Sequence, residues 1–333
     1  MKAVFDGRDV RLGPEGRVLY EQSGYGRPEG NGLRLSPEEA LYLLHRGRIE
    51  VEGHTFDTLL AALASGSNRM RSFLVYRDIR ERGYAVQSGP HDFRVFRRGQ
   101  KPGAGPSQYS VSVVSERDLV VFEKVIGEVS ASRNIRKQHV LAAVDDENEL
   151  TYYEVKVQEP EGVPGGEPLP VLEGELVGRY AVVRTGGKAL PGGWGMQLDP
   201  LRLVLSPLEV LCLMRAGNLV LVDSGKRLDY ESFLHVARES DPEFPEKLAV
   251  YEDLRGRGLV PKTGYKFGHH FRVYTGKKPH SEMLVQALPL AAALPMSSIS
   301  RSVRLAHSVK KKMLFACVHS GGIRYVEFAR IKL

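Results

Sequence analysis

Residues 269–285 read HHFRVYTGKKPHSEMLV, and residues 91–111 read HDFRVFRRGQKPGAGPSQYSV. In both stretches apolar and polar side chains alternate around the shared letters FRV, which begin at Phe93 and at Phe271. Alternation of this kind is the pattern of a half-buried β-strand. The chain therefore carries two copies of one strand motif.

The duplication extends beyond this motif. LRLSPEEALYLL, which contains Ser36, matches LVLSPLEVLCLM, which contains Ser206, and the two serines are 170 residues apart. Phe93 and Phe271 are 178 residues apart. Because the separation changes so little, only small insertions distinguish the two copies. Such repeats are longer than the roughly 20–50 residues of a solenoid unit, and they indicate two fused homologous domains.

The repeats predict the domain organisation. We expect a first repeat over residues 1–157 and a second over residues 174–333, the second divided into an N-terminal subdomain (174–244) and a C-terminal subdomain (245–333). The stretch 158–173 contains QEPEGVPGGEPLP, whose Pro, Gly and Glu content is typical of a linker. With 333 residues and 42% hydrophobic content, the chain can bury two cores.

Composition indicates the cellular location of the protein and the class of partner that it binds. The 47 basic and 40 acidic residues give a net charge of +7, a weak bias towards polyanions such as nucleic acid. No apolar run approaches the roughly 18 residues of a membrane span, and the N-terminus lacks a signal-peptide pattern, so we expect a cytoplasmic protein without membrane contact. Cys212 and Cys317 fit a reducing compartment and core packing, and no zinc-ligand cluster is present, so no metal is predicted.

Each repeat is expected to be mixed α/β. Ser36 and Ser206 have the sequence context of helix N-caps with a capping-box glutamate three residues later, and Gly47 and Gly217 are expected to end these helices. Strand patterns follow, interrupted by a predicted helix from Ser298 to Lys312. The fold class is thus a tandem duplication in which an N-terminal α/β subdomain precedes a subdomain with a largely antiparallel or mixed sheet.

Three side chains of the second repeat could together cut RNA without a metal. Such cleavage needs a base for the 2′-hydroxyl, an acid for the leaving 5′-oxygen and a cation for the phosphorane. Tyr274, His280 and Lys311 could supply these functions, although a tyrosine ordinarily titrates near pH 10 and needs a neighbouring cation to act as a base. The first repeat has Phe96 opposite the tyrosine and Pro106 opposite the histidine.

Each of these residues also has a structural interpretation. A tyrosine that closes a strand commonly packs half-buried, and lysines at a helix end are commonly solvated and favourable to the helix dipole. The tyrosine and the histidine are lost together in a copy that keeps the surrounding frame, which favours a decayed active site. Lys137 remains opposite Lys311, so the lysine could also have a structural or surface use.

At these residues the chain resembles the archaeal tRNA-splicing endonucleases. The matching segments are VYEDLRGRGLVPKTGYKFGHHFRVY, PHSEMLV and SVRLAHSVKKKMLFACV, from about residue 201 to the end, and the first repeat matches more faintly. The resemblance implies a nuclease-like C-terminal subdomain in which Tyr274 is the general base, His280 the general acid and Lys311 the transition-state stabiliser. Lys310 and Lys312 are competing choices, but the family's lysine lies two positions beyond the valine of the motif.

The resemblance also implies the reaction. The family's enzymes cut precursor tRNA at a bulge-helix-bulge element without a metal or another cofactor, and they leave a 2′,3′-cyclic phosphate and a 5′-hydroxyl. In the family, arginines of the active repeats sandwich a bulge base. Arg304 occupies the corresponding helix, opposite Ser130 of the first repeat, and Arg324 is a second candidate. Unpaired bases are usually read by such stacking.

The fused repeats resemble the family's homodimeric class, in which two chains imitate a four-subunit enzyme. This class implies a disarmed repeat whose acidic loop docks into the active repeat of the partner chain. Here the first repeat has DDENE where the second has HSGG, and the acidic residues are Asp145, Asp146, Glu147 and Glu149. An isolated acidic loop is otherwise a solvated turn, but its presence in only one repeat favours docking in a two-fold assembly.

Two other functions stay open at this point. The chain could be a non-catalytic structural subunit of a heteromeric endonuclease, or an RNA-binding protein on the same scaffold. The complete tyrosine, histidine and lysine set in one repeat favours the enzyme.

Overall fold

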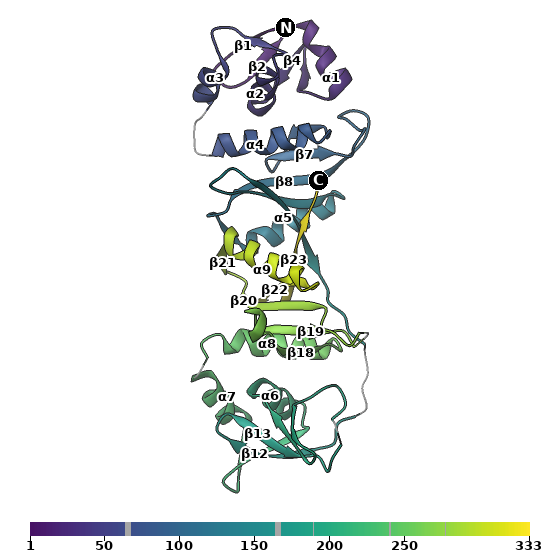
Figure 1. Cartoon of the computed structure of the whole chain (residues 1–333), viewed down its shortest axis with the longest axis vertical. Helices are drawn as coiled ribbons and strands as arrows, with labels where there is room; N and C mark the ends of the chain where they lie inside the picture. Colours follow the sequence, from purple (N-terminus) through teal and green to yellow (C-terminus); the bar gives the residue numbers. More distant parts are fainter. Residues whose placement is uncertain (64–67, 164–167, 189, 240, 277) are drawn as a thin grey trace. The chain divides into compact units, whose positions relative to one another are not determined.

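The computed structural model describes residues 1–63, 68–163, 168–188, 190–239, 241–276 and 278–333 (Figure 1). The chain divides into two compact units. The first unit contains Met1–Val157 together with Ala293–Arg304 and Phe328–Leu333, and the second contains Gln158–Ala292 together with Leu305–Glu327. The predicted linker lies partly outside the described residues, because residues 164–167 are not among them.

The first unit begins with a small sheet and three helices. The sheet order is β3-β4-β2-β1-β5, with all pairs antiparallel except β1 and β5. The elements are β1 (Lys2–Phe5), β2 (Val10–Leu12), α1 (Arg17–Ser23), β3 (Arg27–Glu29), β4 (Gly32–Leu35), α2 (Pro37–His45), β5 (Glu50–Val51) and α3 (Phe56–Leu63), with a 3-10 turn η1 (Pro14–Gly16) before α1.

The rest of the first unit is a helix-covered mixed sheet. Strands run in the order β6-β7-β8-β10-β11, and only β8 and β10 are parallel. The elements are α4 (Asn68–Glu81), β6 (Val86–Ser88), β7 (Phe93–Phe96), β8 (Ser107–Ser115), β9 (Leu119–Val121), α5 (Phe122–Asn134), β10 (Gln138–Val144) and β11 (Leu150–Gln158). β9 pairs separately with β21 (Ala293–Pro295).

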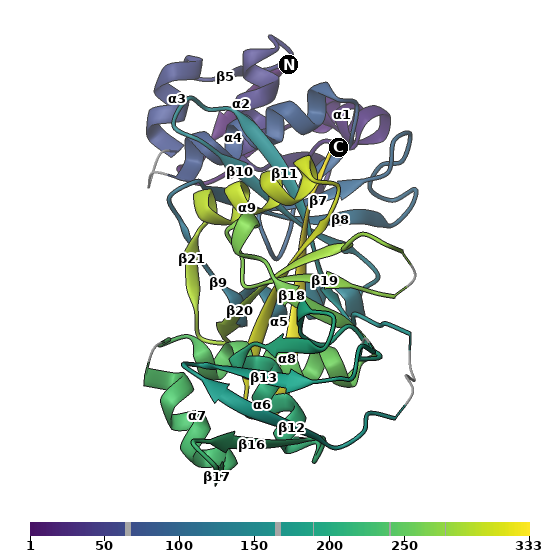
Figure 2. The ribbon, with the colours of Figure 1, turned by 60° about the horizontal axis from the view of Figure 1, so that its bottom comes forward.

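The second unit repeats this plan. Its first sheet has the order β14-β15-β13-β12-β16-β17, and α6 lies against it in Figure 2. The elements are β12 (Leu172–Val177), β13 (Tyr180–Arg184), β14 (Met196–Asp199), β15 (Arg202–Leu205), α6 (Pro207–Arg215), β16 (Leu219–Asp223), β17 (Lys226–Leu228), α7 (Tyr230–Glu239) and α8 (Phe244–Gly256).

Its second sheet contains the strand motif of the sequence. β18 (Val260–Thr263), β19 (Phe271–Tyr274), β20 (Met283–Pro289) and β22 (Lys312–His319) are neighbours in that order, with only β20 and β22 parallel. A 3-10 turn, η2 (Tyr265–Phe267), separates β18 from β19, and α9 (Met296–Ser308) and β23 (Gly322–Ile331) complete the chain. The predicted mixed α/β tandem duplication is confirmed.

Both predicted helix starts are confirmed. The Ser36 amide donates to Glu39 at 2.8 Å and the Ser206 amide donates to Glu209 at 3.0 Å, while each serine hydroxyl accepts from the glutamate amide in return. Each helix ends two residues before a left-handed glycine, Gly47 or Gly217, as the sequence predicted. These reciprocal bonds satisfy amides that a helix start would otherwise leave unpaired.

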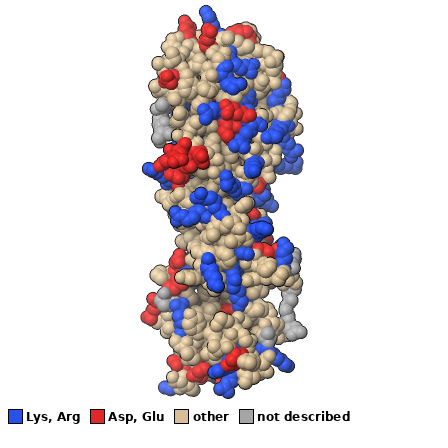
Figure 3. All heavy atoms as spheres, in the orientation of Figure 1, with Lys and Arg blue, Asp and Glu red and all other residues tan. Residues whose placement is uncertain are grey.

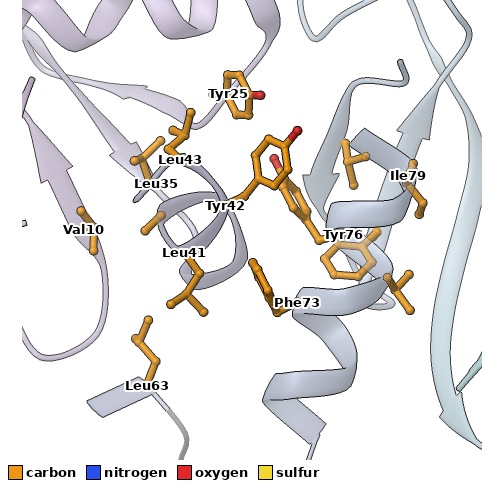
Figure 4. Packing of buried hydrophobic residues seen from close by; sticks show 14 of the residues in the cluster. Val10, Tyr25, Leu35, Leu41, Tyr42, Leu43, Leu63, Phe73, Tyr76 and Ile79 are labelled. Carbon is orange, nitrogen blue, oxygen red and sulfur yellow. The ribbon is translucent and has the colours of Figure 1, made fainter. Parts of the chain in front are cut away.

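Buried side chains connect the subdomains of the first repeat. One cluster runs from the small N-terminal sheet through α2 to α4 and the mixed sheet. In Figure 4, Tyr42 of α2 faces Tyr76 of α4, with the ring centroids 5.9 Å apart. The second unit has two such clusters, one in each subdomain. Cys212 is half-buried against the second of these clusters and Cys317 is buried, and burial raises the pKa of Cys212 to about 11 and that of Cys317 to about 12. No helix among the described residues is long and apolar enough to cross a membrane.

The predicted helix from Ser298 to Lys312 has different bounds. It runs from Met296 to Ser308, because Lys310 adopts a left-handed backbone with φ 55°. The Lys311 amide then donates to the Ala306 carbonyl at 2.8 Å, a bond that closes helices at left-handed residues. The lysine run therefore leaves the helix and enters β22.

Candidate active site

A hydrogen-bond network of a tyrosine, an aspartate and an arginine recurs beside the C-terminal sheet of each repeat. In the second repeat, Tyr325 Oη donates to Asp253 Oδ2 at 2.6 Å, and Arg257 Nε donates to the same oxygen at 2.6 Å. The same bonds, each 2.7 Å long, join the counterparts Tyr152, Asp78 and Arg82. Burial and the neighbouring carboxylate raise the pKa of both tyrosines. The two repeats thus share their supporting structure, and their differences lie elsewhere.

A second shared network contains one of these differences. Glu209 Oε1 accepts from the Gly195 amide at 3.0 Å and from Lys262 Nζ at 2.8 Å. Its counterpart Glu39 accepts from the Gly26 amide at 2.8 Å, but Gln87 stands where the second repeat has the lysine. Burial raises the pKa of Glu39. The same burial acts on Glu209, but Lys262 and the Ser206 and Gly195 amides together outweigh it, and the pKa of Glu209 is lowered.

Tyr274 ends β19 beside an open cavity. It pairs with Val260 of β18, and its side chain is half-buried. The Arg272 guanidinium carbon lies 5.8 Å from the centroid of the tyrosine ring. A cavity of about 980 Å³ adjoins both residues, with further walls from Met196, Tyr251, Lys262 and His269. The phenol is therefore accessible and close to a positive charge.

Lys311 differs from its two neighbouring lysines. Its ammonium donates to the Ser281 carbonyl at 2.6 Å and lies 5.7 Å from the centroid of the Phe267 ring. Lys310 is exposed, and Lys312 forms an ion pair with Glu327 at 3.5 Å. Lys311 has no acidic partner among the described residues, so of the three lysines it is the one held half-buried with its charge unpaired.

His280 reaches the same end of the sheet through the backbone. It is exposed in the connection from β19 to β20 and directly precedes Ser281, whose carbonyl accepts the lysine bond. The Glu282 amide donates to the Val273 carbonyl at 2.9 Å, which brings this connection back beside Tyr274. Over the chain that the structure describes, no hydrogen bond joins the tyrosine, histidine and lysine side chains directly, and Lys277 of this loop is outside it.

The equivalent place in the first repeat is chemically different. Phe96 ends β7 with 6% of its surface exposed, and Pro106 precedes β8. Burial lowers the pKa of Lys137, and the nearby charge of Arg94 lowers it further. No acid or base replaces the missing tyrosine and histidine at these two positions.

The two candidate base-stacking arginines are exposed. Arg304 lies on α9 and Arg324 on β23. Neither forms an ion pair with another residue in the described ranges. Ser130, the counterpart of Arg304, donates its hydroxyl to the carbonyl of Ile126 at 2.8 Å. Both arginines could therefore contact a ligand without breaking an internal ion pair.

The acidic loop is a structured turn between β10 and β11. Asp145 Oδ1 accepts from the Glu147 amide at 3.0 Å and from the Glu149 amide at 2.8 Å, and Asn148 is left-handed with φ 64°. Asp146 pairs with Arg117. In Figure 3, groups of acidic side chains lie beside groups of basic ones on the face drawn. The backbone of the loop is thus held in a defined turn by Asp145.

Three contacts of the site were missed in the sequence. Arg272 lies in the FRV motif that both repeats share, so the comparison of repeats gave it no weight. Ser281 acts through its backbone carbonyl, which no side-chain pattern reveals. Phe267 lies in residues 265–267, which the first repeat lacks, and this insertion was the available signal. The described residues contain no group of three or more His, Cys, Asp or Glu side chains placed to hold a metal ion.

Comparison with known proteins identifies the family. Residues 1–60 match the N-terminal domain of the tRNA intron endonucleases, and residues 70–152 and 244–325 each match their catalytic C-terminal domain. A tRNA-splicing endonuclease of Methanococcoides burtonii is 39% identical over 95% of both chains. Those of Methanosarcina acetivorans and Natronomonas pharaonis are each 38% identical, over 100% and 97% of both chains. The chain therefore belongs to the tRNA intron endonuclease family.

Proposed function

We propose that this chain is a tRNA-splicing endonuclease that cuts precursor tRNA at the intron boundaries of a bulge-helix-bulge element. The observation that carries the proposal is the difference between two otherwise matching repeats. Tyr274, His280 and Lys311 gather at one end of the second repeat's sheet, whereas Phe96 and Pro106 stand at the first two positions in the other copy. The second repeat cuts, and the first supports it.

The proposed reaction needs no metal. Tyr274 takes the proton of the 2′-hydroxyl, and the 2′-oxygen attacks the adjacent phosphorus. His280 donates a proton to the 5′-oxygen as its bond to phosphorus breaks, while the Lys311 ammonium stabilises the negative charge of the phosphorane. The products are a 2′,3′-cyclic phosphate and a 5′-hydroxyl. The open cavity beside Tyr274 supports this assignment because it leaves the phenol reachable by substrate.

A further proposal concerns recognition of the unpaired bulge bases. Arg304 and Arg324 are exposed and free of ion pairs over the described ranges, which suits stacking of a guanidinium on an unpaired bulge base. Stacking requires a planar cation, so lysine should not replace either arginine.

The acidic loop of the first repeat is proposed to dock into the second repeat of a partner chain. Its backbone is held in a defined turn, which lowers the entropy cost of docking. Neutralising Asp145, Asp146 and Glu147 together should convert a dimer into monomers, as measured by mass in solution. An unchanged, active dimer would remove the loop from the assembly.

The test of function is cleavage of a bulge-helix-bulge RNA by the purified chain in EDTA. We expect two cuts per intron, and His280→Ala should abolish them. His235→Ala is the matched control, because His235 is an exposed histidine of α7 that lies 3.2 Å from Glu239 of the same helix. Binding without cutting, unchanged by His280→Ala, would contradict the enzyme. A requirement for a second protein would support a structural subunit.

A further inference from the structure

The connection between β18 and β19 contains an insertion that only the second repeat has. It reads TGYKFGHHF from Thr263, against SGPHDF from Ser88 in the first repeat, and its extra residues form η2. Gly264 permits this path, because a Cβ there would lie 2.7 Å from the His269 carbonyl oxygen. Gly268 closes the turn in a left-handed conformation with φ 65°. The insertion is thus a built turn of defined shape.

This turn presents an aromatic ring to the lysine of the proposed active site. The Lys311 ammonium lies 5.7 Å from the centroid of the Phe267 ring, within the range of a cation–π interaction. Its other partner is the neutral carbonyl of Ser281 at 2.6 Å. A carboxylate in either place would fix the ammonium equally well, but it would also neutralise the charge that the phosphorane needs. A ring and a carbonyl hold the cation and leave its charge available.

The corresponding lysine of the first repeat, Lys137, is in a repeat without this turn. The connection from β6 to β7 contains no counterpart of η2, and burial together with the charge of Arg94 lowers the pKa of Lys137. The lysine is kept in both copies, but among the residues that the structure describes an aromatic ring accompanies it in the second repeat and not in the first. This pattern parallels the distribution of the tyrosine and the histidine.

We propose that Phe267 is a positioning residue for Lys311, and that η2 holds the ring in place. The inference rests on the proposed function, in which Lys311 stabilises the phosphorane. The ring orients the ammonium towards the reacting phosphate, so its removal slows the chemical step and leaves substrate binding unchanged.

The test is single-turnover cleavage of the bulge-helix-bulge RNA, with the enzyme concentration varied up to saturation. Phe267→Leu should lower the rate roughly two- to fivefold with KM unchanged. Phe267→Tyr keeps an aromatic ring and should cut at the rate of the unaltered chain. In a Lys311→Met background, Phe267→Leu should have no further effect, because the group that it positions is gone. Tyr230→Leu is the matched control, since it removes the ring of another cation–π pair in the second repeat, formed with Arg215 at 5.0 Å, and it should not change the rate.

Two outcomes would overturn the inference. One is an equal loss from Phe267→Leu in the presence and absence of Lys311, which would show a general structural effect. The other is a loss of rate in Phe267→Tyr as large as the loss in Phe267→Leu. Should the leucine variant not fold, Phe267→Met fills similar space without a ring and takes its place. Failure of the proposed function is distinguishable, because Lys311→Met would then cut at the rate of the unaltered chain.

Discussion

Each repeat has a buried capping glutamate, and the residue beside it should determine how much that glutamate stabilises the repeat. Glu209 is held by Lys262, whereas Glu39 has Gln87 in the same place. Lys262→Gln gives the second repeat the environment of the first. Gln87→Lys is the reverse change and should stabilise the first repeat.

The magnitude follows from burial. Removing one partner of a buried ion pair costs about 3–5 kcal/mol when both charges are fully desolvated. Here the Glu209 side chain is 7% exposed and the Lys262 side chain 26% exposed. Glu209 also keeps its bonds from the Gly195 and Ser206 amides and from the Ser206 hydroxyl. We therefore expect Lys262→Gln to lower the free energy of unfolding by about 1–2 kcal/mol at pH 7.

The assay is urea unfolding followed by tryptophan fluorescence. Trp194 is the chain's only tryptophan, it belongs to the second unit, and it precedes the glycine that Glu209 contacts. The pKa of Glu209 is lowered by Lys262, so its stabilisation is present at neutral pH and is lost as pH falls through the folded-state pKa. The difference between the unaltered chain and Lys262→Gln should therefore shrink as pH falls below about 4.5.

Two results would refute this reasoning. An unchanged urea midpoint at pH 7 would mean that the lysine contributes nothing to Glu209. An equal loss at pH 7 and at acid pH would mean that the lysine acts through packing and not through its charge. Gln87→Lys should leave the Trp194 transition unchanged and therefore controls for effects outside the second unit.

Three further changes have defined outcomes. Phe96→Tyr should restore no cleavage to the first repeat, because Pro106 still lacks an acid; a second active repeat in the cleavage assay would contradict the account. His139→Met should lower the thermal midpoint, because it removes a buried partner that Glu128 contacts at 3.4 Å and leaves this carboxylate with the exposed Lys124 at 3.7 Å; an unchanged or raised midpoint would argue against this. Tyr325→Phe should lower the free energy of unfolding by about 1–3 kcal/mol, because its hydroxyl bonds a carboxylate, and an unchanged urea midpoint would show that the bond is dispensable.

The sequence predicted the features that depend on neighbouring residues. The capping boxes at Ser36 and Ser206 need only the serine and a glutamate three residues later, and both form as expected. The β19 strand follows from local alternation. The predicted end of α9 was wrong because the backbone of Lys310 is left-handed. Sequence patterns assign this conformation to glycine or asparagine and not to lysine.

Contacts between distant segments could not be predicted in this way. Lys311 meets Phe267 and the Ser281 carbonyl only because β20 pairs with β22 and the β18–β19 turn folds towards them. No spacing in the sequence encodes these distances. The Glu209–Lys262 pair joins two subdomains. The one indication of it in the sequence was a lysine in the second repeat where the first has glutamine.

If the second repeat cuts and the first does not, two matched lysine substitutions must differ in effect. The measurement is the single-turnover rate of bulge-helix-bulge cleavage in EDTA for Lys311→Met and Lys137→Met. We expect a loss of about 10²–10³ in rate for Lys311→Met, the usual effect of removing a transition-state charge stabiliser, and an unchanged rate for Lys137→Met. Equal losses from the two variants, or full activity of Lys311→Met, would contradict this division between the repeats.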